Sequence, residues 1–236
     1  MSRMMPSLWS RFLDLVAPRS CAVCGCRLGI SEQGVCSSCY LHLPRTTYQF
    51  SPYDNPMTQL FWGLAPAVSR AAALFFYEPH SEVARLVYDL KYRDRPEIGV
   101  DMGRMMAEEM RMAGFFDGVD MIVPVPLAPK RQRQRGYNQS ERLAQGLHEV
   151  TGLPVNTKVL CRKGFRQSQT ALQRHQRQEN VADLFALRST IDLAGKHLLL
   201  VDDVCTTGAT LASCADALNV FPGLRISILT LGFTKS

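Results

Sequence analysis

The chain has 236 residues, 46% of them hydrophobic, and its 27 lysines and arginines against 21 acidic residues give a net charge of +6. This composition supplies the core of one ordinary α/β domain with a small appendage, and the charge favours anionic ligands such as diphosphates or nucleic acid without distinguishing between them. No stretch has the length of a membrane span, and charged residues interrupt the N-terminal stretch, which excludes a signal peptide; we expect a globular, cytoplasmic protein.

Two Cys-x-x-Cys pairs stand near the N-terminus with eleven residues between them. In a reducing compartment cysteines at this spacing favour metal ligation over disulfides. Four thiolates can surround one Zn²⁺ tetrahedrally and leave no open position, which predicts a structural site. The predicted ligands are Cys21, Cys24, Cys36 and Cys39. A redox Cys-x-x-Cys pair is the alternative, and Cys26 is left as the odd thiol.

Prolines and turn-forming residues predict how the chain is divided. An amphipathic helix over residues 7–16 and the cysteine pairs form an N-terminal module over residues 1–45. A linker follows over residues 46–65. We expect the main domain over residues 66–236.

The main domain begins with one strand pattern and two helix patterns. Apolar and aromatic residues predict a strand over residues 70–77. Helical spacing predicts helices over residues 81–91 and 103–112. Clustered charge over residues 91–95 is either a solvated helix end or the rim of a substrate cleft.

A second buried strand, over residues 121–126, leads into a cationic segment that we expect to be a loop, before a helix that Asn138 caps. The cations of this segment are Lys130, Arg131, Arg133 and Arg135. Ligands of an open α/β sheet lie at the carboxyl ends of its strands, so the segment should share a crevice with the residues that follow the next strand. It would neutralise a diphosphate there; the alternative is a solvated basic turn or a nucleic-acid patch.

Residues 162–179 are dense in arginine, glutamine and serine and have almost no core-forming side chains. They lie between two predicted strands, over residues 158–161 and 183–187. A mobile lid that closes over a ligand and a disordered basic loop fit this composition equally well.

The apolar run over residues 198–201 predicts a buried strand that leads directly into Asp202 and Asp203. The spacing after them predicts a helix, whose N-terminal N–H groups and dipole favour a phosphate. The residues expected to hold that phosphate are Thr206, Thr207, Gly208, Ala209 and Thr210. The two acids would repel it, so we expect them to bind vicinal hydroxyls or a hydrated Mg²⁺. A solvated turn is the alternative.

This stretch resembles the 5-phosphoribosyl-1-diphosphate (PRPP) motif of type I phosphoribosyltransferases. The resemblance implies an α/β fold with an open, mainly parallel sheet flanked by helices. It also implies that Asp202 and Asp203 contact the ribose hydroxyls and that residues 206–210 hold the 5′-phosphate. Cys205 departs from the motif and places a thiol beside the phosphate.

A wider resemblance covers nearly the whole chain. The Pro-Val-Pro-Leu and Arg-Gly-Tyr-Asn-Gln-Ser runs, Gln169-Thr170, Asn180-Val181, the PRPP motif and the cysteine pairs are similar to the ComF/GntX family of phosphoribosyltransferase-like proteins. That resemblance implies a role in DNA uptake during competence, or in the use of external DNA as a nutrient.

We therefore expect a nitrogen nucleophile to displace Mg-diphosphate from C1 of PRPP. Asp202 and Asp203 would orient the ribose, while Mg²⁺ and the cations of residues 130–135, Arg133 and Arg135 among them, stabilise the leaving group. Two alternatives remain. The protein is a non-catalytic PRPP or nucleotide sensor for DNA-processing partners, or an accessory protein that binds single-stranded DNA.

Overall fold

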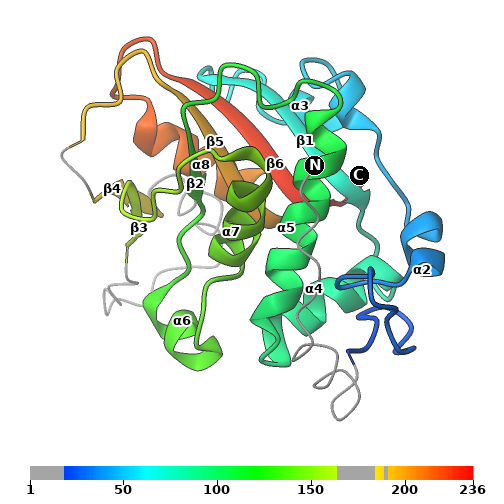
Figure 1. The fold of residues 1–236 in the computed structure, drawn as a ribbon. Coiled ribbons are helices and arrows are strands. Elements are labelled where there is room, and N and C mark those ends of the chain that lie inside the picture. The colour runs from blue at the N-terminus through cyan, green and yellow to red at the C-terminus, as the bar shows by residue number, and fades with distance from the viewer. Residues whose placement is uncertain (1–18, 164–183, 189–190, 236) are drawn as a thin grey trace, which may run out of the picture.

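In the computed structural model, which describes residues 19–163, 184–188 and 191–235, four parallel strands form the central sheet in the order β1-β6-β5-β2 (Figure 1). The strands are β1 (Val68–Phe76), β2 (Met121–Pro124), β5 (His197–Cys205) and β6 (Arg225–Phe233). The apolar side chains at the centre of β5 are fully buried, as expected for a parallel strand covered on both faces. The structure confirms the predicted fold class.

Two layers of helix cover this sheet. Figure 1 shows α5 (Pro96–Arg111) and α7 (Gln139–Thr151) on one face and α8 (Ala209–Leu218) on the other. α4 (Glu82–Tyr92) leads into α5, and Ser81 caps it by accepting a hydrogen bond from the Ala84 N–H. The helices predicted over residues 81–91 and 103–112 are thus present, although α5 begins earlier than expected because Pro96 occupies its first turn.

A short helix, α6 (Pro129–Arg135), occupies the position where we expected a cationic loop. Pro129 stands at its first turn, and Gly136 ends it with a φ of 77°. This is the arrangement in which a proline starts and a glycine stops a helix, so the expectation of a loop was wrong for a reason the sequence contained.

Two smaller strands form a separate antiparallel pair, β3 (Leu160–Arg162) and β4 (Phe185–Leu187). They agree with the strands predicted over residues 158–161 and 183–187. Most of the predicted lid, residues 164–179, and the predicted helix over residues 7–16 lie outside the described residues. Among the described residues, no helix is long and apolar enough to cross a membrane.

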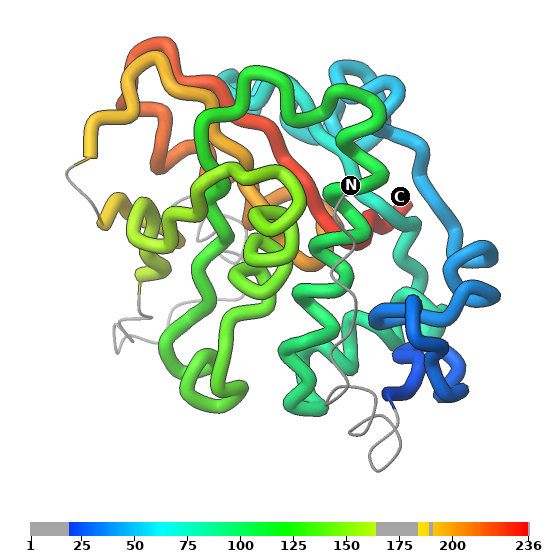
Figure 2. Tube along the Cα trace, viewed as in Figure 1, coloured from blue at the N-terminus to red at the C-terminus, as the bar shows by residue number. Residues whose placement is uncertain are grey.

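The cysteine-containing segment folds against the main domain, and Figure 2 shows it in dark blue at the lower right of the molecule. It contains α2 (Ser37–His42). Arg85 on α4 donates to the Val23 carbonyl at 2.7 Å, and Arg45 pairs with Glu109 on α5 at 2.9 Å. The segment is therefore tied to both α4 and α5.

The segment predicted as the linker, residues 46–65, packs against β1. It contains η1 (Tyr48–Phe50) and α3 (Pro56–Gln59). Asn55 caps α3 and donates from its side chain to the Ala71 carbonyl of β1 at 2.9 Å. Phe61, which follows α3 in the chain, is also buried.

α5 and α7 approach each other closely through glycines. A Cβ at Gly103 would overlap the Leu143 carbonyl oxygen, and a Cβ at Gly146 would overlap the Val100 carbonyl oxygen. Both glycines lie inside helices, where alanine is intrinsically preferred. The close contact between the two backbones explains why glycine occupies both positions.

We predict that Gly103→Ala or Gly146→Ala lowers the free energy of unfolding by about 1–3 kcal/mol, because the methyl group forces the helices apart. Urea denaturation measures the loss. Glu108→Ala, at an exposed position of α5, is the control and should stay within about 0.5 kcal/mol of the wild type. A stabilising effect of either glycine substitution would contradict the close contact.

Candidate active site

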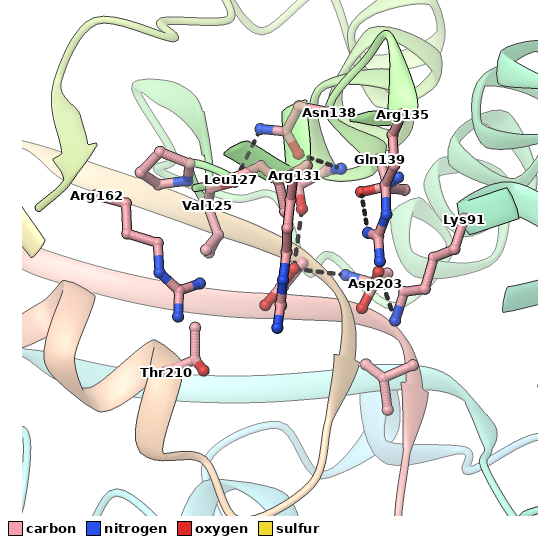
Figure 3. A pocket seen from close by; sticks show the side chains of 14 residues that line it. Lys91, Val125, Leu127, Arg131, Arg135, Asn138, Gln139, Arg162, Asp203 and Thr210 are labelled. Carbon is pink, nitrogen blue, oxygen red and sulfur yellow. Dashed lines mark hydrogen bonds and ion pairs between the residues drawn. The ribbon is translucent and has the colours of Figure 1, made fainter. Parts of the chain in front are cut away.

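A cavity of about 180 Å³ lies at the carboxyl ends of β2 and β5 (Figure 3). Its lining combines two acids, four cations and two hydroxyls: Asp202, Asp203, Lys91, Arg131, Arg135, Arg162, Ser140 and Thr210. These residues come from α4, α6, α7, β3, β5 and α8. The crevice expected between the cationic segment and the acidic pair is therefore present.

Asp202 lines this cavity. Its carboxylate accepts hydrogen bonds from the Ser140 hydroxyl and from the Asp203 N–H, both at 2.9 Å. The residue keeps some contact with solvent, but protein atoms enclose its carboxyl group. This burial, followed by the neighbouring charge of Asp203, raises the pKa of Asp202 to about 7.

Asp203 also lines the cavity and forms an ion pair with Lys91, with 2.9 Å between Oδ2 and Nζ. Both side chains are largely shielded, with 14% and 24% of their areas exposed. Figure 3 shows Lys91 and Arg135 beside Asp203, with Arg162 and Thr210 across the cavity. The acids therefore differ: one is buried among neutral donors and the other is paired with a cation.

The geometry of α6 divides the four predicted cations into two pairs. Arg131 and Arg135, one helical turn apart, both line the cavity, whereas Lys130 and Arg133 do not. Arg135 is fixed by donating to the Gln139 side chain at 3.1 Å and to the Tyr92 hydroxyl at 3.2 Å. Lys130 and Arg133 are exposed to solvent.

The predicted phosphate loop follows β5 as expected. Gly208 is the N-cap of α8 with a φ of 76°, and it has no side chain to cap the first-turn N–H groups. Thr210 lines the cavity, Thr206 and Thr207 are exposed, and Ala209 is half-buried. The loop can thus present backbone N–H groups and hydroxyls to an anion at the cavity edge.

Cys205 is buried at the end of β5, with 2% of its area exposed. Burial raises the pKa of its thiol to about 12, so it stays protonated. It acts as an ordinary small side chain.

Three site residues escaped sequence reasoning or were only touched by it. Lys91 was predicted only as part of a charged cluster, and Arg162 only as part of the lid. Ser140 was missed, although its place two residues after the helix cap Asn138 was a usable signal. Asn138 accepts from the Ser140 N–H at 3.1 Å and donates to the Val125 carbonyl at 3.0 Å, which ties the start of α7 to the end of β2.

Five thiols gather in the N-terminal segment. The sulfur atoms of Cys21, Cys24, Cys26 and Cys36 all lie within 4.8 Å of one another. Cys39 adjoins them: its N–H donates to the Cys36 sulfur at 3.5 Å, and burial raises the pKa of its thiol. The structure therefore brings three predicted ligands together with the odd thiol Cys26 and leaves Cys39 beside that group.

Comparison with known proteins places these features in context. The family model "Phosphoribosyl transferase domain" matches residues 91–232. The chain is 30% identical over 213 residues to the DNA utilization protein YhgH of Salmonella typhi, covering 86% of this chain and 92% of that protein. It is 27% identical over 206 residues to competence protein F of Haemophilus influenzae, covering 81% and 86%. A solved structure of the allosteric regulatory enzyme of purine biosynthesis aligns with a TM-score of 0.39 and 18% identity, over 60% of this chain and 29% of that one.

The raised pKa of Asp202 predicts a pH-dependent stability. The pKa of Asp202 is higher in the folded chain than in the unfolded chain. The protonated carboxyl therefore contributes its full stabilisation of the fold at pH values below the unfolded pKa, and this stabilisation is lost as pH rises through about 7. Asp202→Asn mimics the protonated form, so its stability relative to the wild type should increase from pH 4 to pH 8.

Urea denaturation at several pH values measures this difference. Asp216→Asn, at an exposed position of α8, controls for the loss of one carboxylate. A difference between Asp202→Asn and the wild type that stays constant with pH would contradict the assignment.

Proposed function

The chain belongs to the ComF/GntX family, whose members carry a phosphoribosyl transferase domain, and from this premise we propose that it binds PRPP with Mg²⁺ and transfers the phosphoribosyl group to a nitrogen acceptor. One observation carries the proposal: the acidic pair, the phosphate loop and two arginines of α6 adjoin one cavity. PRPP has hydroxyls, a monophosphate and a diphosphate that match these three groups.

In this proposal the 5′-phosphate lies on residues 206–210, at the N-terminus of α8. The ribose hydroxyls donate to Asp202 and Asp203. Arg131 and Arg135 bind the diphosphate, whose charge suits guanidinium groups.

The ion pair between Lys91 and Asp203 gives Lys91 a second role. When a ribose hydroxyl occupies Asp203, the Lys91 ammonium can bind the diphosphate instead. The cavity has four cations and two acids before the ligand enters, and this surplus of positive charge favours an anionic diphosphate.

Mg²⁺ fits the donor set at this site. Two neighbouring carboxylates, one with a raised pKa, mark a place where a further cation would be favourable. Together with the oxygens of PRPP, Asp202 and Asp203 would hold the ion, which supplies positive charge to the leaving diphosphate.

The transfer itself needs no covalent nucleophile from the protein. The lone pair of the acceptor nitrogen forms the bond to C1 while the bond from C1 to the diphosphate oxygen breaks, and the diphosphate leaves with that electron pair. The proton of the acceptor nitrogen passes to a diphosphate oxygen. Arg131, Arg135 and Lys91 stabilise the charge that develops, and Asp202 and Asp203 hold the ribose in place.

The names of the relatives connect this chemistry to DNA. We infer a cytoplasmic role in the uptake of DNA or in its use as a nutrient, together with DNA-processing proteins. Lys130 and Arg133 favour a second candidate function, because they are exposed and lie outside the cavity. They fit a protein that binds single-stranded DNA and uses PRPP or a nucleotide only as a signal.

A matched pair of substitutions on α6 tests PRPP binding. Arg131→Ala should weaken the calorimetric affinity for PRPP with Mg²⁺ by roughly 10–100-fold, because it removes a charge-assisted hydrogen bond. Arg133→Ala removes the same charge outside the cavity and should change it by less than about twofold. Asp202→Asn with Asp203→Asn should abolish binding.

Further assays separate the candidate functions. Release of diphosphate with nitrogen bases or amines would establish an enzyme, and PRPP binding without release would favour the sensor. Binding of an oligonucleotide that falls steeply with salt and survives Asp202→Asn would favour the DNA-binding function. A wild type that does not bind PRPP would overturn the proposal.

The thiol cluster suits a structural Zn²⁺. Soft thiolates within 4.8 Å of one another are the donors that this ion prefers, and four of them complete its coordination. The metal would supply folding energy to a segment whose own core is small.

We predict one Zn²⁺ per chain by metal analysis. Cys21→Ser and Cys24→Ser should lose the metal and lower the melting temperature, whereas Cys161→Ser, outside the module, should not. Comparison of Cys26→Ser with Cys39→Ser identifies the fourth ligand. Clearly less than one Zn²⁺ per chain would contradict a structural site.

A further inference from the structure

A cavity of about 560 Å³ lies beside the amino end of β1, away from the candidate active site at the carboxyl ends of the sheet. Its walls come from η1 and the residues that follow it, from the start of β1, and from the turn after α5. Figure 1 shows this turn and α6 at opposite ends of the sheet. We call it the amino-end cavity. Its volume is in the range of pockets that hold small organic ligands.

Arg70 gives the amino-end cavity a buried positive charge, since only 4% of its area is exposed. It stands opposite Ser227 in the register of β1 and β6, and its Nε donates to the Ser227 hydroxyl at 2.7 Å. Nη2 donates to the Asp117 backbone carbonyl at 2.8 Å, and Nη1 donates to the Tyr53 hydroxyl at 3.4 Å. These three partners are neutral. A bound anion would therefore balance a charge that they leave uncompensated.

The Arg70 guanidinium is held in one orientation. Its central carbon lies 5.3 Å from the centroid of the Phe115 ring, which covers one face of the group. Tyr53 lines the cavity, so Nη1 is the nitrogen on that side. A guanidinium has more N–H groups than these three hydrogen bonds use. Its fork suits the two oxygens of a carboxylate.

Two other titratable groups near Arg70 leave its charge in place. Asp54 lines the cavity but is exposed to solvent. His197 lies behind Arg70, with its Nε2 2.8 Å from the Ser227 hydroxyl. Burial, followed by the charges of Arg70 and Arg225, lowers the pKa of His197 to about 4, so its imidazole is neutral near pH 7. The buried part of the site is therefore positive.

Large apolar side chains line the same cavity and remain open to water. Phe50 and Met112 have 73% and 83% of their areas exposed, and Tyr53 has 61%. They come from segments far apart in the chain, so their meeting at one cavity is a property of the fold. Such a cluster around a buried cation suits a ligand with an apolar body and an anionic end.

We propose that the amino-end cavity binds a small organic carboxylate, whose oxygens accept hydrogen bonds from Arg70 and Tyr53 and whose apolar ring or chain is covered by Phe50 and Met112. The inference goes beyond the proposed function and does not rest on it. The amino-end cavity and the candidate active site share no lining residue, so both can be occupied at once.

Three probes test this chemistry on the full chain by ligand-observed NMR titration. Naphthylacetate has the carboxylate and the apolar body, naphthylacetamide lacks the charge, and acetate lacks the apolar body. We expect naphthylacetate to bind at least about tenfold more tightly than either of the other two, because hydrogen bonds to a charged group are the stronger ones. Equal affinity for the acid and the amide, or no binding of naphthylacetate, would overturn the proposal.

Substitutions then locate the bound probe. Phe50→Ser should weaken naphthylacetate binding at least about fivefold, because the ring covers the apolar body. Val220→Ser is the matched control: 67% of Val220 is exposed, it lies outside the cavity, and its loss should have no effect. Unchanged affinity in Phe50→Ser would place the probe elsewhere and contradict the assignment.

Arg70→Gln should reduce the affinity for naphthylacetate to that for the amide. Because Arg70 is buried, circular dichroism and urea denaturation first establish that this variant is folded. Phe50→Ser changes an exposed side chain and decides the question if Arg70→Gln does not fold.

Further arms separate this site from the candidate active site. Saturating PRPP with Mg²⁺ should change the affinity for naphthylacetate by less than about twofold, as should Asp202→Asn, because the two cavities share no lining residue. Displacement of the probe by PRPP would overturn this inference and leave the proposed function in place. Naphthylacetate binding that depends on Phe50, in a wild type that does not bind PRPP, would do the reverse. If a short peptide ending in phenylalanine binds and naphthylacetate does not, the cavity holds a protein terminus and the small-ligand assignment fails.

Discussion

The close contact between the backbones of α5 and α7 positions two of the residues that line the candidate site. α5 follows directly from α4, which carries Lys91, and α7 begins at the residues that hold Ser140. Because glycines at the contact bring the two helices together, Lys91 and Ser140 can each reach one acid of the pair on β5. A wider spacing between the helices would leave Asp203 without its cation and Asp202 without its hydroxyl donor.

The electrostatics of the cavity follow from this arrangement. A buried acid and a paired acid stand beside each other, and cations from three elements face them. The site therefore has its charges arranged before a ligand arrives, and in the proposed function the diphosphate would replace contacts that already exist. Such preorganisation is where electrostatic catalysis gains its advantage over water.

Sequence reasoning was most successful where one continuous stretch contains the whole signal. The apolar run, the acids and the loop after them predicted β5, the acidic wall and the start of α8 from residues adjacent in the chain. It was weaker where a site residue arrives from another element, as with Ser140, because its position after the cap Asn138 indicates the start of a helix and not the partner on β5 that its hydroxyl contacts. α6 was missed because the prediction rested on the run of charges. Pro129 and Gly136, which mark the two ends of the helix, were not weighed. For the thiols, spacing predicted Cys39 as the fourth ligand and left Cys26 as the odd thiol, whereas the structure groups Cys26 with the other three, because that choice depends on the path of the turns.

Arg85 of α4 links the N-terminal segment to the main domain. One side chain contacts the cysteine-containing segment through the Val23 carbonyl and also lines a cavity of about 480 Å³ beside α4. The segment consequently supports the wall of that cavity through a direct contact with α4. A shorter chain beginning after residue 45 would retain the central sheet but would lose the support of that wall, and with it the independence that modular architecture usually implies.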